Sequence, residues 1–183
     1  MIRFKEFRDR WVDFCKRINK EGLSKGERGK GIGAEFEKYF FENVLSSLKI
    51  QGQKLVSQRK IRGINYKWDF LLVNENSSDM FEVDPSEVLA VFEVKAHGGY
   101  GYKSVYHLRD VFDSVERANP QIKIFYVTFR ETDTYDRKDR EIFGKHVQEY
   151  YRLSNSGDGV QLPPKAYFPN EWDRLVKDLS ELR

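Results

Sequence analysis

Hydrophobic and polar residues follow two different periods along this chain, and together they predict a fold of mixed helices and strands. Some segments have apolar side chains at helical spacing, which places these side chains on one face of an amphipathic helix. The predicted helices span 4–18, 34–48, 102–118, about 141–153 and a last segment capped by Asn170. Other segments are rich in β-branched and aromatic residues and alternate with a period of two, as strands do. The predicted strands span 64–73, 89–96 and 122–129, with a shorter extended run at 53–60.

The connections between these segments predict how the strands pair. The strands 64–73 and 89–96 are joined by a polar stretch at 74–87, so we expect them to be antiparallel neighbours. The helix at 102–118 is long enough for a crossover connection. The strand at 122–129 is therefore expected to lie parallel to the strand before that helix.

Glu93 and Lys95 stand on the same face of the strand 89–96, at its C-terminal end. Both faces of this strand begin with apolar residues, so we expect the strand to be covered on both sides. Because buried charge is costly unless it is paired or bound to a metal, these two residues are candidates for chemistry. The alternative is an ion pair on a partly exposed strand, and so short a pattern does not distinguish the two interpretations.

Two further carboxylates belong to segments that would pack near this strand. Asp69 lies in the middle of its predicted strand, although aspartate is a poor strand former, and the expected pairing brings it close to Glu93 and Lys95. A hydrogen bond to a loop amide would be a purely structural reason for Asp69. Glu37 lies at the edge of the apolar stripe of the second predicted helix, where it either faces inward or is an ordinary first-turn acid favoured by the helix dipole.

The composition is that of a soluble globular protein. The chain has 183 residues, of which 39% are hydrophobic and 33% charged, and this length predicts one domain over 1–183. No apolar run approaches the length of a membrane span and no signal peptide opens the chain. The single cysteine, Cys15, excludes an internal disulfide and argues against a cysteine-based zinc site. We therefore expect a cytoplasmic protein without a membrane partner.

The net charge of +3 permits nucleic-acid binding without requiring it, but the basic residues cluster. The first cluster consists of Lys25, Arg28 and Lys30 within the Gly-rich segment 19–33, and the second consists of Lys54, Arg59, Lys60, Arg62 and Lys67. The Gly-rich segment shows no apolar period and is interpreted as a loop. Both clusters would favour a phosphodiester backbone, and both could equally be a solvated basic surface.

Taken in order, these residues resemble the PD-(D/E)XK nuclease superfamily, which has the restriction-endonuclease-like fold. The resemblance covers about 33–129 and depends on the motifs Gly33-Ala34-Glu35-Phe36-Glu37, Arg62-Gly63 with Trp68-Asp69-Phe70-Leu71, and Phe92-Glu93-Val94-Lys95-Ala96. No proline precedes Asp69, a departure that is frequent in this superfamily. Asp84 is an alternative to Asp69, but it lies beside Pro85 in the polar connection, where no strand would orient it.

The resemblance implies an α/β (α+β) fold with a restriction-endonuclease-like core, in which a central mixed sheet of four to five strands is flanked by helices. The N-terminal helix at 4–18 and the C-terminal helices within 141–183 would be additions to a core at about 33–129. In function it implies a divalent-metal-dependent endonuclease that hydrolyses phosphodiester bonds in DNA, of the restriction, repair or junction-resolving type.

The residue types suit this chemistry independently of the resemblance. Asp69 and Glu93 offer hard oxygen ligands for Mg²⁺, with Mn²⁺ as a substitute, and the main-chain carbonyl of Val94 could complete the protein ligands. Glu37 could bind a second ion or hold a water molecule, whose pKa the bound ion would lower. Lys95 would orient the attacking water or neutralise charge in the transition state.

Several side chains around these motifs are candidates for contact with nucleic acid. They are Lys30, Arg59, Lys60, Arg62, Lys67, His97 and Tyr102. His97 and Tyr102 follow the Glu-x-Lys motif in a Gly-rich turn, where plain loop residues are the alternative. His107 and His146 lack any metal-ligand spacing and are interpreted as surface or packing residues.

Two other classes of function stay open at this point. A catalytically silent nuclease-fold module could bind nucleic acid or a protein partner, although such modules usually lose a metal ligand or the lysine, and none is missing here. An unrelated α/β domain could carry the Glu-x-Lys pattern by accident. If the chain does cut both DNA strands at once, it needs two active sites, which a homodimer would provide.

Overall fold

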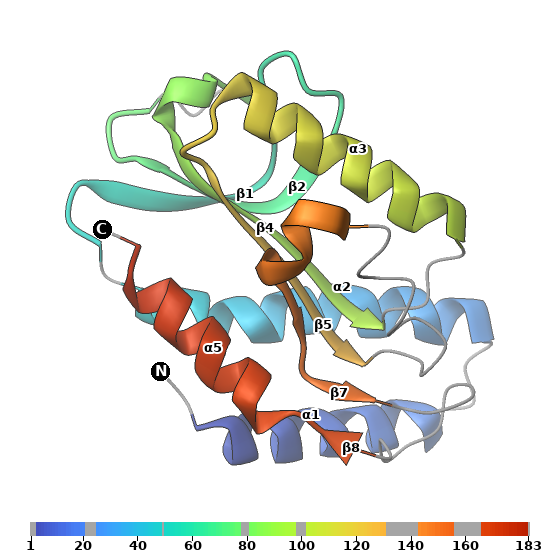
Figure 1. Ribbon diagram of the computed structural model, residues 1–183. Helices are drawn as coiled ribbons and strands as arrows, with labels where there is room; N and C mark the ends of the chain where they lie inside the picture. Colours follow the sequence, from blue (N-terminus) through green and yellow to red (C-terminus); the bar gives the residue numbers. More distant parts are fainter. Residues whose placement is uncertain are drawn as a thin grey trace.

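A mixed sheet lies at the centre of the fold and has helices on both of its faces (Figure 1). The structure is a computed structural model that describes residues 3–20, 25–48, 50–77, 81–97, 102–130, 143–155 and 166–182. The α-helices are α1 (Phe4–Lys20), α2 (Lys25–Asn43), α3 (Tyr102–Ala118) and α5 (Pro169–Ser180), and the 3₁₀ helices are η1 (Leu45–Ser47), η2 (Pro85–Glu87) and η4 (Gly144–Glu149). The strands are β1 (Gln53–Ile61), β2 (Lys67–Asn74), β3 (Glu82–Val83), β4 (Val88–His97), β5 (Lys123–Arg130), β6 (Tyr150–Arg152), β7 (Ser154–Asn155) and β8 (Ala166–Tyr167).

The central strands have the connectivity that the sequence predicts. The order in the sheet is β3-β1-β2-β4-β5-β6, and β7 and β8 form a separate antiparallel pair. β1, β2 and β4 make an antiparallel meander, whereas β5 follows β4 through α3 and lies parallel to it. Helix, meander, helix and parallel strand is the core expected of the restriction-endonuclease-like fold. Both predicted strand pairings and the predicted fold class are therefore confirmed.

Among the described residues the sheet has six strands, so the prediction of four to five is wrong. The short strand β3 adds to the edge of β1, and β6 adds to β5 at the other edge. β6 also replaces part of the helix predicted at about 141–153, whose first two residues lie outside the described part of the chain. Tyr150 and Tyr151 are both buried, but they belong to the apolar layers on opposite sides of the sheet. A strand allows consecutive side chains to enter two layers, and a helix does not.

The Gly-rich segment is the second place where the structure differs from the sequence prediction. The segment 19–33 was expected to be a loop, yet α2 already begins at Lys25. Ile32 lies one turn before Phe36 and is buried with it and with Phe40, so the apolar stripe of the helix extends further toward the N-terminus than its glycines indicate. A glycine inside a helix costs about 1 kcal/mol relative to alanine, and this packing offsets part of that cost.

α5 begins two residues earlier than expected and without a side-chain cap. Asn170 was predicted to cap this helix, but Phe168 is its N-cap residue and Pro169 takes the first helical position. Proline suits that position because its missing N–H has no helical partner there in any case. Trp172, Leu175 and Leu179 on α5 are buried, as the apolar spacing predicts.

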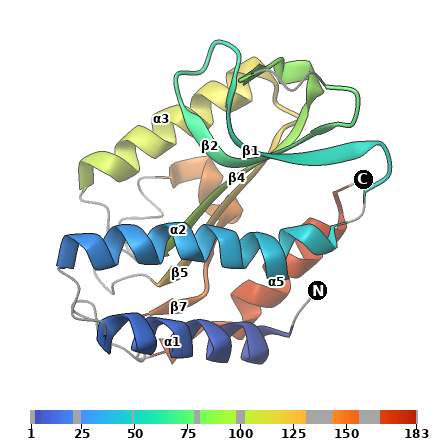
Figure 2. The ribbon, with the colours of Figure 1, turned by 180° about the vertical axis from the view of Figure 1, so that it is seen from behind.

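Two apolar layers hold the sheet between the helices. One layer joins α1, α2 and α5 to the face of the sheet that carries Phe92 and Phe129, and the other joins α3 to the opposite face. Figure 2 shows α2 crossing the sheet on the side away from α3. The first layer is strongly aromatic, with ring centroids 4.8 Å apart for Trp11 and Phe36 and 4.9 Å for Phe7 and Trp172. No helix in the described part of the chain combines the length and hydropathy of a membrane span.

Candidate active site

The candidate site lies where β2 and β4 separate. The antiparallel pairing of these two strands ends at Phe70 and Phe92, and within the described residues no further pair follows toward Lys95. Beyond that point the backbone N–H of Val94 donates a hydrogen bond of 2.8 Å to Asp69 Oδ2. The Asp69 carboxylate thus replaces a main-chain acceptor at the point where the strands part. This contact is a structural use of Asp69, and it also fixes the direction of the carboxylate.

Lys95 joins the two acidic side chains that the sequence singles out. Its ammonium lies 2.9 Å from Asp69 Oδ2 and 2.5 Å from Glu93 Oε1. Asp69 is 6% exposed and Glu93 is 3% exposed, whereas the side chain of Lys95 keeps 17% of its surface. The structure therefore brings the three residues together, as the predicted meander requires. Glu93 and Lys95 do form the ion pair that was the alternative interpretation, but Glu93 is buried and the pair also includes Asp69.

A tyrosine fixes the second carboxylate. The hydroxyl of Tyr66 donates a hydrogen bond of 2.7 Å to Glu93 Oε1, and the Tyr66 ring packs edge-on against Trp68. Trp68 in turn belongs to the apolar layer under α3, not to the layer of Phe70 as strict alternation along β2 would require. The other oxygen, Glu93 Oε2, is buried and has no hydrogen-bond partner among the described residues.

Burial and repulsion by Asp69 raise the pKa values of two carboxyl groups toward neutral pH. Burial, together with the charge of Asp69, raises the pKa of Glu93 from 4.5 to about 7, although Lys95 and Tyr66 oppose this shift. Glu37 on α2 is half-buried, and burial followed by the charge of Asp69 raises its pKa to about 7 as well. Glu37 lies well inside α2, which begins at Lys25, and so it does not belong to the first turn of the helix. Glu37 is therefore more than a first-turn acid on the helix surface.

A pocket of about 490 Å³ lies beside Asp69, Glu93 and Lys95. Its lining consists of Gln58, Tyr66, Lys67, Asp69, Glu93, Lys95, His107 and Leu108. Three strands and helix α3 contribute to this lining, so the pocket opens at the C-terminal end of β4. A phosphodiester group with its neighbouring sugars is of a size that such a pocket can accept.

The donor set of the pocket fits a hard divalent cation. Asp69 and Glu93 supply carboxylate oxygens, which Mg²⁺ and Mn²⁺ prefer. The partnerless Oε2 of Glu93 is the specific observation in favour of an ion, because a buried acceptor without a donor is otherwise costly.

The predicted nucleic-acid contacts are only partly gathered at this pocket. Lys67 lines it, whereas Lys60 donates a hydrogen bond to Asn65 and Arg62 forms an ion pair with Asp84 at 3.1 Å. Arg59 is half-buried on β1. The side chains of Lys30, His97 and Tyr102 lie outside the described part of the structure.

Asp84, the alternative to Asp69, has a structural task away from the pocket. Its carboxylate accepts hydrogen bonds from the backbone N–H and the hydroxyl of Ser86 at the start of η2. These bonds, with a contribution from Arg62, lower the pKa of Asp84. An N-capping aspartate of this kind is explained by local geometry alone.

Three polar residues of the pocket were not among the candidates from the sequence, and neither was Leu108. Tyr66 reads as an ordinary aromatic residue of a strand, and only its bond to Glu93 reveals a further role. His107 was interpreted as a surface or packing residue, but its ring lies 5.9 Å from that of Tyr66 at the edge of the pocket. The helix at 102–118 follows the strand of Lys95 and packs back across the sheet. A polar residue in its first turns, such as His107, could therefore have been expected near Lys95. Gln58 gives no signal in the sequence.

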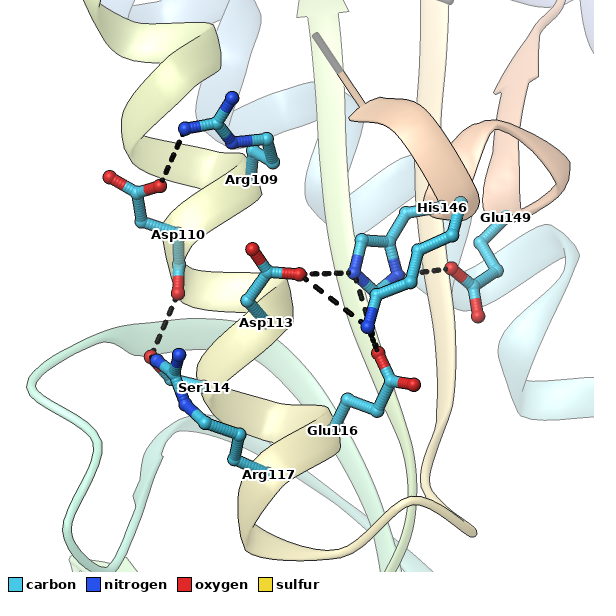
Figure 3. Close-up of polar contacts among 9 residues, drawn as sticks. Arg109, Asp110, Asp113, Ser114, Glu116, Arg117, His146 and Glu149 are labelled. Carbon is cyan, nitrogen blue, oxygen red and sulfur yellow. Dashed lines mark hydrogen bonds and ion pairs between the residues drawn. The ribbon is translucent and has the colours of Figure 1, made fainter.

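A second polar cluster lies on the far part of α3 (Figure 3). His146 on η4 is buried, with Nε2 3.0 Å from Asp113 Oδ1 and Nδ1 2.8 Å from Glu149 Oε2. Asp113, Glu116 and His146 have the spacing of a metal site. However, the ammonium of Lys145 already contacts Glu116 and lies 3.8 Å from Asp113. This cluster is therefore a polar network that ties η4 to α3, and the burial of His146 agrees with its interpretation as a packing residue.

Comparisons with known proteins identify relatives by structure only. No protein-family model and no curated protein sequence matches the chain. The cAAA-bound form of NucC from P. aeruginosa ATCC27853 superposes with a TM-score of 0.57 at 14% identity, over 98% of this chain and 90% of that one. The cAAA-bound form of NucC from E. coli MS115-1 gives a TM-score of 0.55 at 16% identity, over 98% and 89% of the two chains. At these identities the likeness establishes a shared fold.

Proposed function

We propose that this chain is a divalent-metal-dependent endonuclease that hydrolyses phosphodiester bonds in DNA. The observation that carries the proposal is the convergence of Asp69, Glu93 and Lys95 on one pocket, with a buried Glu93 oxygen that lacks a donor among the described residues. Such an arrangement weakens a fold, and a catalytic use would explain it. The restriction-endonuclease-like fold supports the proposal, since it is the fold in which the sequence motifs were expected.

In this proposal Asp69, Glu93 and the main-chain carbonyl of Val94 hold a Mg²⁺ ion, for which Mn²⁺ can substitute. The ion, when bound, supplies Lewis acidity toward water and phosphate. Lys95 orients the attacking water and neutralises negative charge that develops on the phosphate oxygens. Glu37 on α2 holds a water molecule or a second ion. Its pKa of about 7 would also allow it to accept a proton near neutral pH.

The basic side chains would bind the DNA backbone around the reacting phosphate. Lys67 is the nearest of them, because it lines the pocket itself. Arg59 and Lys60 lie further along β1, and Arg62 would exchange its ion pair with Asp84 for a phosphate. Each phosphate that is neutralised in this way makes the affinity more dependent on salt. Contacts from Lys30, His97 and Tyr102 stay predictions from the sequence.

The test is cleavage of supercoiled plasmid in the presence of Mg²⁺ or Mn²⁺, with EDTA as the metal-free control. The NucC structures are those of a cAAA-bound form, so each reaction is run with and without cAAA. Nicking or linearisation that needs the cation is the expected result. If cleavage occurs only with cAAA, the nuclease proposal holds and the ligand controls it.

Matched variants assign the activity to this pocket. Glu93→Gln and Lys95→Met should abolish cleavage, because each removes a charge from the pocket while keeping a similar shape. Glu75→Gln makes the same chemical change at an exposed position beyond β2 and should cut like the wild type. Cleavage that persists in the Glu93→Gln variant would show that the activity arises elsewhere or from a contaminant.

The alternative function is a catalytically silent module that binds nucleic acid or a protein partner. It would give a salt-sensitive gel shift with plasmid DNA but no cleavage with either cation, with or without cAAA.

Cutting of both strands in one encounter would further require two sites, and light scattering of the purified protein tests whether a homodimer supplies them.

A further inference from the structure

Gln58 on β1 has a backbone conformation that glutamine seldom adopts. Its φ is +56°, and among the described residues it is the one non-glycine with a positive φ. The other positive values belong to Gly52, Gly63 and Gly144. Residues other than glycine are disfavoured at positive φ, because their Cβ atom crowds the backbone. Strain of this kind persists only where the surrounding structure enforces it, and it is frequent at functional sites.

The register of the sheet places this strained residue directly opposite Asp69. Ser57 pairs with Phe70 and Arg59 pairs with Trp68, so Gln58 and Asp69 face each other across β1 and β2. Within this register, Gln58 and Asp69 are the one pair of opposite residues whose backbones are not paired. Residues opposite each other in an antiparallel pair project to the same face of the sheet. Gln58 accordingly lines the pocket together with Asp69, Glu93 and Lys95.

The carboxamide of Gln58 differs in chemistry from the other polar groups of the pocket. It carries two N–H donors and a carbonyl acceptor but no charge. It therefore does not repel an anionic substrate, and its N–H groups can donate to one. A phosphodiester has two non-bridging oxygens that need donors, and Lys95 is already engaged by both carboxylates.

We propose that Gln58 is a substrate-contacting residue whose carboxamide donates a hydrogen bond to a non-bridging oxygen of the bound phosphodiester. The positive φ of Gln58 is the backbone conformation that directs the side chain into the pocket. This inference rests on the proposed function, since it concerns the phosphodiester substrate of the same pocket. It adds a contact from β1 to the lining that β2, β4 and α3 provide.

The test separates the side chain from the backbone strain. Gln58→Gly relieves the strain and removes the carboxamide, so it should raise Tm by about 2–4 °C while lowering kcat/KM for a DNA duplex by about 10- to 100-fold. Gln58→Met keeps the length and the strain but removes the donors, so it should lose activity to the same degree without a gain in Tm. The control Ser57→Gly changes an exposed neighbour on the other face of β1 and should leave kcat/KM unchanged.

Binding of the duplex in EDTA distinguishes a failure of this inference from a failure of the proposed function. If the wild type cuts and the Gln58 variants cut equally well, Gln58 makes no functional contact and the inference is wrong while the function stands. If the wild type binds DNA but does not cut, both Gln58 variants should still bind about 10-fold more weakly, and unchanged affinity overturns the contact. If the wild type neither binds nor cuts DNA, both proposals fail.

Discussion

Glu93 should weaken the metal-free fold near neutral pH, so the variant Glu93→Gln is expected to be more stable than the wild type although it is inactive. The carboxyl is buried, and its pKa is raised from 4.5 to about 7 by burial first and by Asp69 second. The unfolded chain therefore loses this proton at lower pH than the folded chain does. Stability falls as pH rises from about 4.5 to about 7 and is then constant.

The size of the effect follows from the two pKa values. Integrated over pH, the shift costs the fold about 3 kcal/mol at about pH 8 and about 1 kcal/mol at about pH 5. Glutamine in place of Glu93 removes the charge and keeps an oxygen that can accept from Tyr66. The free energy of unfolding of the variant should therefore exceed that of the wild type by about 3 kcal/mol at about pH 8 and by about 1 kcal/mol at about pH 5.

Urea denaturation in EDTA at the two pH values measures this difference, with Glu75→Gln as the control because Glu75 is exposed. The decisive quantity is how much the difference in free energy of unfolding between variant and wild type changes from one pH to the other. If the variant gains equally at both, burial of the charge is not what limits stability. If the variant is less stable than the wild type at about pH 8, the ion pair of Glu93 with Lys95 outweighs the cost of burial and the argument is refuted.

Three further outcomes are expected. The cleavage rate at low metal concentration should rise with pH through about 7 and then level off, because Glu93 and Glu37 must ionise; a rate that is flat between about pH 6 and about pH 8 would contradict this. Binding of Mn²⁺ near pH 7 should release protons from the same groups, which calorimetry in buffers of different ionisation enthalpy detects, and a heat independent of the buffer would argue against it. His146→Phe should lower the free energy of unfolding by about 2–4 kcal/mol, since Asp113 and Glu149 lose their polar contacts with the buried imidazole; unchanged urea denaturation would show that this network is not stabilising.

The sequence predicts the meander and the position of its acids because both depend on local rules. Alternation places Glu93 and Lys95 on one face, and a short polar connection makes the neighbouring strand antiparallel, which brings Asp69 beside them. These inferences need no knowledge of the rest of the fold. The proximity of the three residues was therefore accessible, while their roles stay proposals.

Features that depend on distant packing were not accessible in this way. The bond from Tyr66 to Glu93 spans 27 positions, and the positive φ of Gln58 is imposed by the strands around it. Tyr150 and Tyr151 fit a helical pattern until it is known that two apolar layers receive them. In each case the deciding information lies in another element of the fold.

The pocket lies at one end of β2 and β4, and the connection between these strands leaves from the other end. The residues from Asp69 to Asn74 span about 16 Å of extended chain, and Asn76 beyond them is exposed. A chemical label at this end would report on the protein without touching the reacting groups. Since Cys15 is the single cysteine, the double variant Cys15→Ser and Asn76→Cys would carry one thiol for a fluorophore. Energy transfer from labelled DNA could then follow docking and release in real time, apart from any cutting.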